Sequence, residues 1–523
     1  MATIETQVLI IGGGVTGAGI MRDLSLRGIH CILIEKKDLC AGASGGNHGL
    51  LHSGARYVSN DLQSAVECQA EGATLKSIAP HCIEETGGLF VGVEGDDESF
   101  AAAFPSLCST AGIDCEEISS AAARELEPVL SDKLVSAFRV ADATIDPFHL
   151  ALENVAQATT ACASNYMPYC RILRFDSANG RLQAAVCEDM RSGETFRIEA
   201  LQFVNAGGAW AMNIASLAGC TDVHLLWSKG TLLISHDRIT AHVINRLRPP
   251  GDGDILVPGG TVSVLGTTSV RVESIDNLRP TVEEVNANIT EARAMIPSLE
   301  GIRYIRAFSR VRPLVQTITT GDDRNVARSF SLFEHSDCVD NFCTITGGKL
   351  TTYRLMAEKT ADLVAARLGN TRPCTTHTTP LPDAASCKWT TPGASPRYWY
   401  SAKKPEDMIL CECEMVPQSA IDEVIRHAPG AQKKISLEGI ALRTRAGKGP
   451  CQGSFCGIRI ASHLYDKKHY TDTTGLYHMR DFFSERFKGM RSVIWGRQMA
   501  QMELAEALHC GLLGLENLDA STS

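Results

Sequence analysis

The sequence contains no apolar run that approaches the roughly 20 residues needed to cross a bilayer. Its net charge of −10 gives no support to nucleic-acid binding, which depends on Lys and Arg. The N-terminus lacks the charged and apolar regions of a secretory signal, so we expect a cytoplasmic protein. In that reducing compartment the 19 cysteines do not predict a disulfide framework.

A glycine-rich turn follows the first apolar stretch of the chain. Val8-Leu9-Ile10-Ile11 is typical of a buried parallel strand, and it leads into a G-x-G-x-x-G motif before a segment with helical spacing. A second strand ends at Glu35, where an acid can accept hydrogen bonds from ribose hydroxyls. Together these features predict dinucleotide binding, with the cofactor at Gly12, Gly14, Thr16, Gly17 and Glu35.

Two further apolar strands also end in glycine turns, and a run of small residues follows Glu35. The two turns are Gly207-Gly208-Ala209-Trp210 and Gly347-Gly348-Lys349-Leu350-Thr351, and the small residues extend from Cys40 to Gly54. Backbone without bulky side chains can pass close to a flat cofactor. Three glycine turns therefore indicate one extended ligand, and the motif itself leaves FAD and NAD open.

The order of these motifs resembles that of the FAD-dependent glycerol-3-phosphate dehydrogenases, within the D-amino-acid-oxidase-like flavoproteins, and in particular the catalytic subunits of the anaerobic enzymes. The resemblance covers essentially the whole chain. The segments that carry it are IIGGGVTGAGI, GASGGNHGLLHSGARY, DATIDPFHL, NAGGAWA, ILVPGGTVSVLGTTS, SRVRPLV and TGGKLTTYRLMAE. It implies FAD as the cofactor, with further contacts from Ser44, Gly207, Gly208, Trp210, Gly347, Gly348, Lys349, Leu350 and Thr351.

The resemblance implies a fold of α/β and α+β class, in which a Rossmann-like FAD-binding domain is interleaved with an antiparallel-sheet substrate cap. We expect FAD-binding segments at about 1–80, 147–220 and 336–370, and cap segments at about 81–146 and 221–335. A stretch rich in Pro and Thr, 371–404, predicts a linker. Residues 405–465 are expected to form a small helical module, and 466–523 a tail that docks on its own domain or on a partner.

The activity that the resemblance implies is oxidation of sn-glycerol 3-phosphate to dihydroxyacetone phosphate by hydride transfer to flavin N5. A base must take the hydroxyl proton, and His52 is the expected base, with His48 as the weaker candidate. The alternative for His52 is a hydrogen bond to cofactor or backbone. A phosphate group needs fixed cations. By the family match the substrate site is lined by Arg56, Tyr57, Arg312, Arg328 and Lys349, and Arg312 is also assigned to catalysis.

Four cysteines near the C-terminus form two pairs in the sequence, C-x-C at Cys411 and Cys413 and C-x4-C at Cys451 and Cys456. Four thiolates can hold zinc or an iron–sulfur cluster. The pattern is similar to bacterioferritin-associated-ferredoxin-like domains, which implies a [2Fe-2S] cluster, with zinc as the alternative occupant. The second pair is spaced more widely than the C-x2-C of that small ferredoxin.

A one-electron centre beside a flavin favours a dehydrogenase over an oxidase. The resemblance implies further subunits of a heteromeric complex, including an iron–sulfur subunit, that carry electrons to the membrane quinone pool in anaerobic respiration. The chain would then lie peripherally on the inner face of the cytoplasmic membrane. The competing interpretations are an amine or amino-acid dehydrogenase, which the number of candidate cations disfavours, and a non-catalytic electron-transfer subunit.

Overall fold

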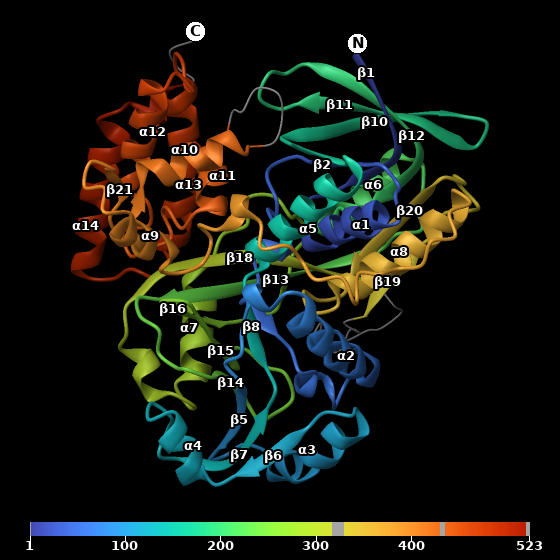
Figure 1. The fold of residues 1–523 in the computed structure, drawn as a ribbon. Coiled ribbons are helices and arrows are strands. Elements are labelled where there is room, and N and C mark those ends of the chain that lie inside the picture. The colour runs from blue at the N-terminus through green and yellow to red at the C-terminus, as the bar shows by residue number, and fades with distance from the viewer. Residues whose placement is uncertain (1, 316–328, 429–434, 519–523) are drawn as a thin grey trace.

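The computed structural model describes residues 2–315, 329–428 and 435–518. Two large β-sheets are built from segments that alternate along the chain, and the C-terminal helices pack beside them as a third unit (Figure 1). Within those described ranges no helix combines the length and the hydropathy that a membrane span requires.

An eight-stranded sheet is the centre of the first unit. β1 pairs in parallel with β2 and β12, β2 with β9, and β12 with β20, which is the predicted Rossmann-like arrangement. β10, β11 and β19 add antiparallel strands. The strands are β1 (Ala2–Ile11), β2 (Cys31–Glu35), β9 (Asn165–Pro168), β10 (Cys170–Ala178), β11 (Arg181–Asp189), β12 (Thr195–Asn205), β19 (Phe330–Phe333) and β20 (Phe342–Gly347).

The apolar run at the end of β1 is buried on both faces of this sheet. Val8 and Ile10 belong to one core, and Leu9 and Ile11 belong to another. Such a strand needs apolar side chains at successive positions, which explains the continuous hydrophobic run in the sequence. The helices that supply the first core are α1 (Val15–Leu26), α5 (Pro147–Cys162) and α8 (Tyr353–Arg367), and α6 (Ala211–Leu217) supplies the second.

A nine-stranded sheet forms the cap. Its pairings are antiparallel apart from β5 with β14, which are parallel. That pair departs from the predicted antiparallel sheet because its strands come from separate segments and no hairpin fixes their direction. The strands are β5 (Gly88–Val93), β6 (Cys115–Ile118), β7 (Leu134–Val140), β13 (Leu225–Ser235), β14 (Val243–Arg246), β15 (Ile255–Gly259), β16 (Val262–Gly266), β17 (Val270–Arg271) and β18 (Tyr304–Val315). The cap helices are α3 (Glu98–Thr110), α4 (Ser120–Leu126) and α7 (Val282–Ala292).

A small three-stranded sheet lies where the chain passes between the first unit and the cap. It consists of β3 (Leu50–Leu51), β4 (Ile83–Glu84) and β8 (Ala143–Ile145). The short 3-10 helix η2 (Ala55–Tyr57) and α2 (Leu62–Ile78) fall between β3 and β4 in the sequence. The candidate site residues Arg56 and Tyr57 lie on η2.

The structure differs from the predicted division of the chain at β19 and in the predicted linker. β19 lies in the range predicted for the cap, 221–335, yet it pairs with β20 of the first sheet. The range predicted as a linker, 371–404, is packed, because Leu381 is buried in the first core and Arg22 donates from Nη2 to the Thr379 carbonyl at 2.5 Å. Isolated side chains and backbone carbonyls make these contacts, so no hydrophobic period reveals them in the sequence.

The third unit has its own core, which extends from Trp389 to Leu515 and crosses the predicted boundaries at 405 and 465. The predicted tail packs into this core through Phe482 and Phe483. Its elements are α9 (Ala394–Ala402), β21 (Ile409–Cys411), β22 (Val416–Pro417), α10 (Gln418–Arg426), α11 (Leu437–Arg443), α12 (Cys456–Asp466), α13 (Thr474–Met490), α14 (Arg497–Glu506) and the π-helical turn η8 (Ala507–Gly511). The unit docks on the first sheet through Arg443, whose Nη1 lies 2.6 Å from Asp38 Oδ2.

Candidate functional site

The glycine-rich turn between β1 and α1 leaves no room for side chains. Gly12 has a φ of +116°, and a Cβ there would collide with the carbonyl of Ala206. A Cβ on Gly17 would collide with the carbonyl of Gly12. Gly17 therefore allows α1 to pack closely against the turn that precedes it. The first residues of α1 line a cavity, where the helix N-terminus favours an anion.

Glu35 ends β2 beside this turn. Its Oε2 accepts a hydrogen bond from Gly13 N at 2.8 Å, and its Oε1 accepts one from Lys37 N at 2.9 Å. Burial raises the pKa of Glu35, and these two backbone N–H groups act in the opposite direction. The carboxylate is thereby held at the cavity wall, where its remaining lone pairs can accept hydrogen bonds from hydroxyl groups.

A single cavity of about 1030 Å³ lies at the carboxyl ends of the strands of the first sheet and beneath the cap. Most of the predicted site residues line it: Gly12, Gly14, Thr16, Glu35, Ser44, His52, Arg56, Tyr57, Gly207, Gly208, Trp210, Arg312, Gly347, Gly348, Lys349 and Leu350. Gly17 and Thr351 do not, and Thr351 is fully buried, with its Oγ1 accepting from His52 N at 3.2 Å. Arg328 lies outside the described residues.

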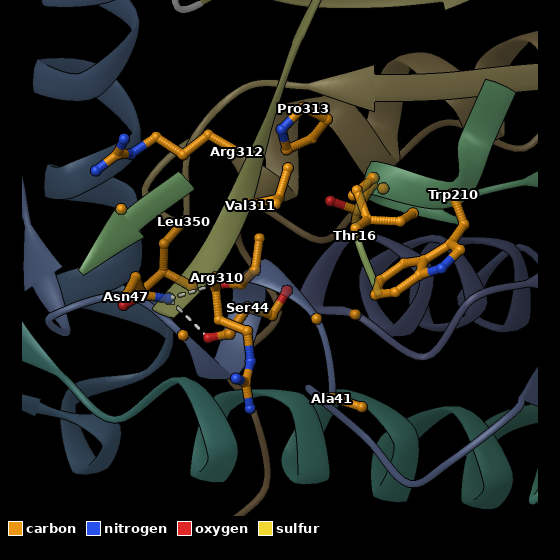
Figure 2. Close-up of a pocket in the computed structure, with 18 of the residues that line it drawn as sticks. Thr16, Ala41, Ser44, Asn47, Trp210, Arg310, Val311, Arg312, Pro313 and Leu350 are labelled. Atoms are coloured by element: carbon orange, nitrogen blue, oxygen red, sulfur yellow. Dashed lines mark hydrogen bonds between the residues drawn. The ribbon is translucent and has the colours of Figure 1, made fainter. Parts of the chain in front are cut away.

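Trp210 and Arg312 lie on opposite sides of this cavity (Figure 2). On the Trp210 side, Lys36 places its Nζ 3.8 Å from the centre of the indole ring. Between the two sides, Ser44 Oγ accepts from Val15 N at 3.0 Å, and Asn47 Nδ2 donates to the Ser44 carbonyl at 2.6 Å (Figure 2). The predicted run of small residues is thus hydrogen-bonded to the start of α1, and the lining of the cavity extends from Trp210 to Arg312.

Two histidines line the cavity beside η2. His52 is 9% exposed, and its Nε2 lies 3.3 Å from the Tyr57 hydroxyl. Burial, followed by the charges of His48, Arg56 and Lys349, lowers the pKa of His52 well below 6.5. Burial also lowers the pKa of His48 to about 3, and its Nδ1 is buried without a hydrogen-bond partner. Burial therefore favours the neutral form of both rings.

Arg56 has one half of its guanidinium paired and the other half unsatisfied. Nη2 lies 3.2 Å from Oδ2 of Asp254, a fully buried carboxylate that Arg248 also binds at 2.7 Å. Nη1 is buried and has no hydrogen-bond partner among the described residues. A buried donor without a partner is rare in folded proteins. Because Arg56 lines the cavity, this N–H is placed to bind an anionic ligand.

Arg312 and Lys349 are held in place by oxygen acceptors. Arg312 Nη2 donates to Thr267 Oγ1 at 2.6 Å and to the Thr268 carbonyl at 3.0 Å. Lys349 Nζ donates to Ser64 Oγ at 2.7 Å. These acceptors fix the positions of two cationic groups at the cavity wall.

Arg310 is a cavity residue that is absent from the site predicted from the sequence. It lies two positions before Arg312 on β18, so the two side chains share one face of the strand. That spacing in the sequence is the signal that could have identified Arg310. Its Nη2 donates to Glu485 Oε1 at 3.3 Å. Glu485 and Lys488 come from α13, so the third unit supplies part of the cavity wall.

The four predicted thiols come together in the third unit as two contacting pairs. The Cys456 thiol hydrogen-bonds Cys411 and lowers its pKa to about 6, with further help from the backbone N–H groups of Gly447 and Glu414. Cys413 contacts Cys451, and burial raises the pKa of Cys413 to about 11. A Cβ on Gly449 would collide with Cys413. Two pairs of sulfur atoms, with backbone N–H groups beside them, fit a metal ion or cluster bound by thiolates.

Comparison with known proteins places the chain among flavoproteins. Residues 7–363 match the family model described as FAD dependent oxidoreductase. A subunit of the anaerobic glycerol-3-phosphate dehydrogenase of Escherichia coli (strain K12) is 40% identical over 98% of this chain and 97% of its own length. The corresponding protein of Haloferax volcanii is 36% identical over 97% of this chain and 90% of its own length.

Solved structures show the same fold at lower identity. The glycerol-3-phosphate dehydrogenase from Bacillus halodurans, solved in complex with FAD, matches with a TM-score of 0.69 and 21% identity, covering 94% of this chain and 96% of that one. A glycine oxidase from Geobacillus kaustophilus matches with a TM-score of 0.58 and 19% identity, covering 73% of this chain and 99% of that one. These likenesses confirm the predicted fold class, a Rossmann-like domain interleaved with a cap.

Proposed function

The chain belongs to the FAD dependent oxidoreductase family, and on that premise we propose that it oxidises sn-glycerol 3-phosphate to dihydroxyacetone phosphate. The observation that carries this proposal is the unpartnered, buried Nη1 of Arg56 in a cavity that Arg310, Arg312 and Lys349 also line. A phosphomonoester brings close to two negative charges, and fixed cations in a shielded cavity match that charge. The 40% identical relative is a glycerol-3-phosphate dehydrogenase subunit by name.

The glycine turns and Glu35 are the features of the cavity that fit FAD. Glycine turns after β1, β12 and β20 open the wall of the cavity to a large flat ligand, and Glu35 lies beside the first of them. We assign Gly12, Gly14, Thr16 and the turns at 207–208 and 347–348 to FAD contacts. Bound FAD supplies the acceptor for the two electrons and the hydrogen that leave the alcohol carbon.

We assign His52 as the group that takes the hydroxyl proton of the substrate. Its ring is neutral because burial and nearby cations disfavour the protonated form. The Tyr57 hydroxyl, 3.3 Å from Nε2, and the bond from His52 N to Thr351 fix the position of the residue. Its burial also excludes bulk water from the proton transfer. Arg56, Arg312 and Lys349 hold the phosphate, which orients the alcohol toward His52.

We further propose that Cys411, Cys413, Cys451 and Cys456 hold a [2Fe-2S] cluster that takes electrons onward. Two contacting sulfur pairs suit two metal ions with two thiolates each, and the N–H of Gly447 adds a hydrogen bond to sulfur. The Arg443–Asp38 ion pair brings the third unit against the flavin-binding unit, and α13 reaches the cavity wall through Glu485. Electrons would then leave one at a time toward the membrane quinone pool.

The acceptor in this proposal is a further, iron–sulfur subunit of the complex, because the relative from Escherichia coli is by name one subunit of a larger enzyme. We place its docking on an exposed apolar surface at α14 and the residues around it, because α14 has no residue buried in the chain itself. The surface consists of Trp495, Met499, Leu504, Leu508 and Leu512, each at least half exposed. On the same stretch of chain, the His509 ring lies 5.6 Å from the ring of Phe455, which precedes Cys456. Docking there would bring the acceptor near the thiols.

The substrate assignment is tested by mixing the purified, flavin-loaded chain with candidate substrates in the absence of oxygen. sn-Glycerol 3-phosphate should bleach the flavin absorbance, whereas glycine and L-proline should leave it unchanged. Bleaching by an amino acid and not by glycerol 3-phosphate would overturn the proposal in favour of the amino-acid dehydrogenases of the same fold.

A further inference from the structure

A second group of metal-binding side chains lies away from the cavity, where three segments meet. The segments are the 3-10 helix η3 (Pro80–Cys82), the first two turns of α5 and the packed stretch near Asp383. The residues are His81, Cys82, His149, Glu153 and Asp383, and none of the five lines the cavity. They are also separate from the four thiols of the third unit.

The ligand atoms form two triads that share His149. Those of His81, Cys82 and His149 lie within 4.8 Å of one another, as do those of His149, Glu153 and Asp383. Nε2 of His149 is 3.2 Å from Oε1 of Glu153.

The charges of the group are not balanced by a fixed cation. Glu153 is fully buried, and its oxygens accept from Ala384 N at 3.1 and 3.2 Å and contact His149. Across the described part of the chain, no Lys or Arg forms an ion pair with Glu153. Burying a carboxylate without a cation is costly. Nε2 of His81 is also buried and lacks a hydrogen-bond partner.

We propose that His81, Cys82 and His149 bind one zinc ion. Two imidazoles and a thiolate are ligand types that zinc prefers, and the ion would bind the unpartnered nitrogen of His81 and offset the charge of Glu153, which contacts His149. The site has a structural role. The stretch 381–387 leads to the third unit. Two hydrogen bonds hold it here: Ala384 N donates to Glu153, and Leu381 N donates to the Ile78 carbonyl at 2.7 Å. Zinc strengthens that attachment.

The test is elemental analysis of the full-length, flavin-loaded chain after purification with zinc in the buffer. We expect one zinc per chain in the native protein and its loss in Cys82→Ala, with flavin content and iron content unchanged. Cys31→Ala removes another buried cysteine and serves as the matched control, which keeps its zinc. His81→Gln, at a half-buried position, gives the same readout if Cys82→Ala does not accumulate as folded protein.

A second measurement addresses the attachment. Limited proteolysis should cut the stretch 371–404 at least several-fold faster in His81→Gln than in the native chain, and added zinc should protect only the native chain. Native protein without zinc would overturn the proposal and leave a buried His149–Glu153 pair. Zinc that is retained in Cys82→Ala and His81→Gln but lost in Cys411→Ser would also overturn it, because the ion would then occupy the four-thiol site.

Discussion

Replacing Arg56 by Ala removes the donor on which the substrate assignment rests. Nη1 of this side chain is buried, unpartnered and at the cavity wall. If it donates to the substrate phosphate, the variant loses one charge-assisted hydrogen bond, worth about 1.5 to 3 kcal/mol. At about 1.4 kcal/mol per factor of ten, glycerol 3-phosphate should bind about 10- to 150-fold more weakly.

The fold should survive this change, because Asp254 keeps other partners. Arg248 Nη2 lies 2.7 Å from Asp254 Oδ1, and Gly251 N also donates to this carboxylate. Arg248→Ala is the matched control: it removes one partner of Asp254 but no group from the cavity wall. We expect that variant to bind the substrate with native affinity.

The assay is a titration of the oxidised, flavin-loaded chain with dihydroxyacetone phosphate as a non-reducing ligand, followed by single-turnover flavin reduction by glycerol 3-phosphate and by glycerol. Glycerol lacks the phosphate, so Arg56→Ala should lower its reduction efficiency by less than about threefold, within ordinary mutational scatter. An equal loss for both alcohols, or unchanged affinity for the phosphate ligand, would refute the assignment of Arg56.

Four further outcomes are expected. His52→Ala should slow flavin reduction about 100- to 10,000-fold, the range for general bases, while substrate affinity changes little; fast reduction in this variant would exclude His52 as the base. The rate of reduction should show no acid-side loss near pH 6.5, because the folded pKa of His52 lies well below that value; its contribution to stability instead falls as the pH drops below 6.5, where only the unfolded chain takes up the proton. Cys451→Ser should abolish the paramagnetic signal of the reduced cluster and leave flavin bleaching intact, so a variant that keeps the signal would contradict the four-thiol assignment. Leu508→Glu with Leu512→Glu should prevent co-purification with the iron–sulfur subunit without changing bleaching, and retained co-purification would move the docking surface elsewhere.

Local patterns account for the parts of the structure that could be predicted from the sequence. The turn at Gly12 and Gly14 is recognised from the glycine spacing alone, although the atoms that exclude side chains there belong to Ala206 and Ser44. The strand ending at Glu35 and the four cysteines are also recognised by their spacing. In each case residue types at a fixed spacing carry the signal.

Contacts between distant segments could not be predicted in the same way. Arg310 meets Glu485 across 175 residues, and the packing of α13 on β18 decides that contact. Thr351 follows a correctly predicted glycine turn, yet the start of α8 turns it inward to His52 N. The stretch 371–404 has no periodic pattern because Leu381 and backbone carbonyls hold it. Tertiary packing determines these three arrangements, and a single sequence carries no local pattern for it.

The central claim is that one chain oxidises glycerol 3-phosphate at the cavity and passes the electrons to its own four-thiol site. The most direct test is anaerobic rapid mixing of the loaded chain with glycerol 3-phosphate, with flavin absorbance and the paramagnetic signal of the cluster followed together. The account predicts bleaching of the flavin and then a cluster signal that depends on Cys411, Cys413, Cys451 and Cys456. A flavin that stays oxidised, or one that bleaches while the cluster stays silent, would contradict it.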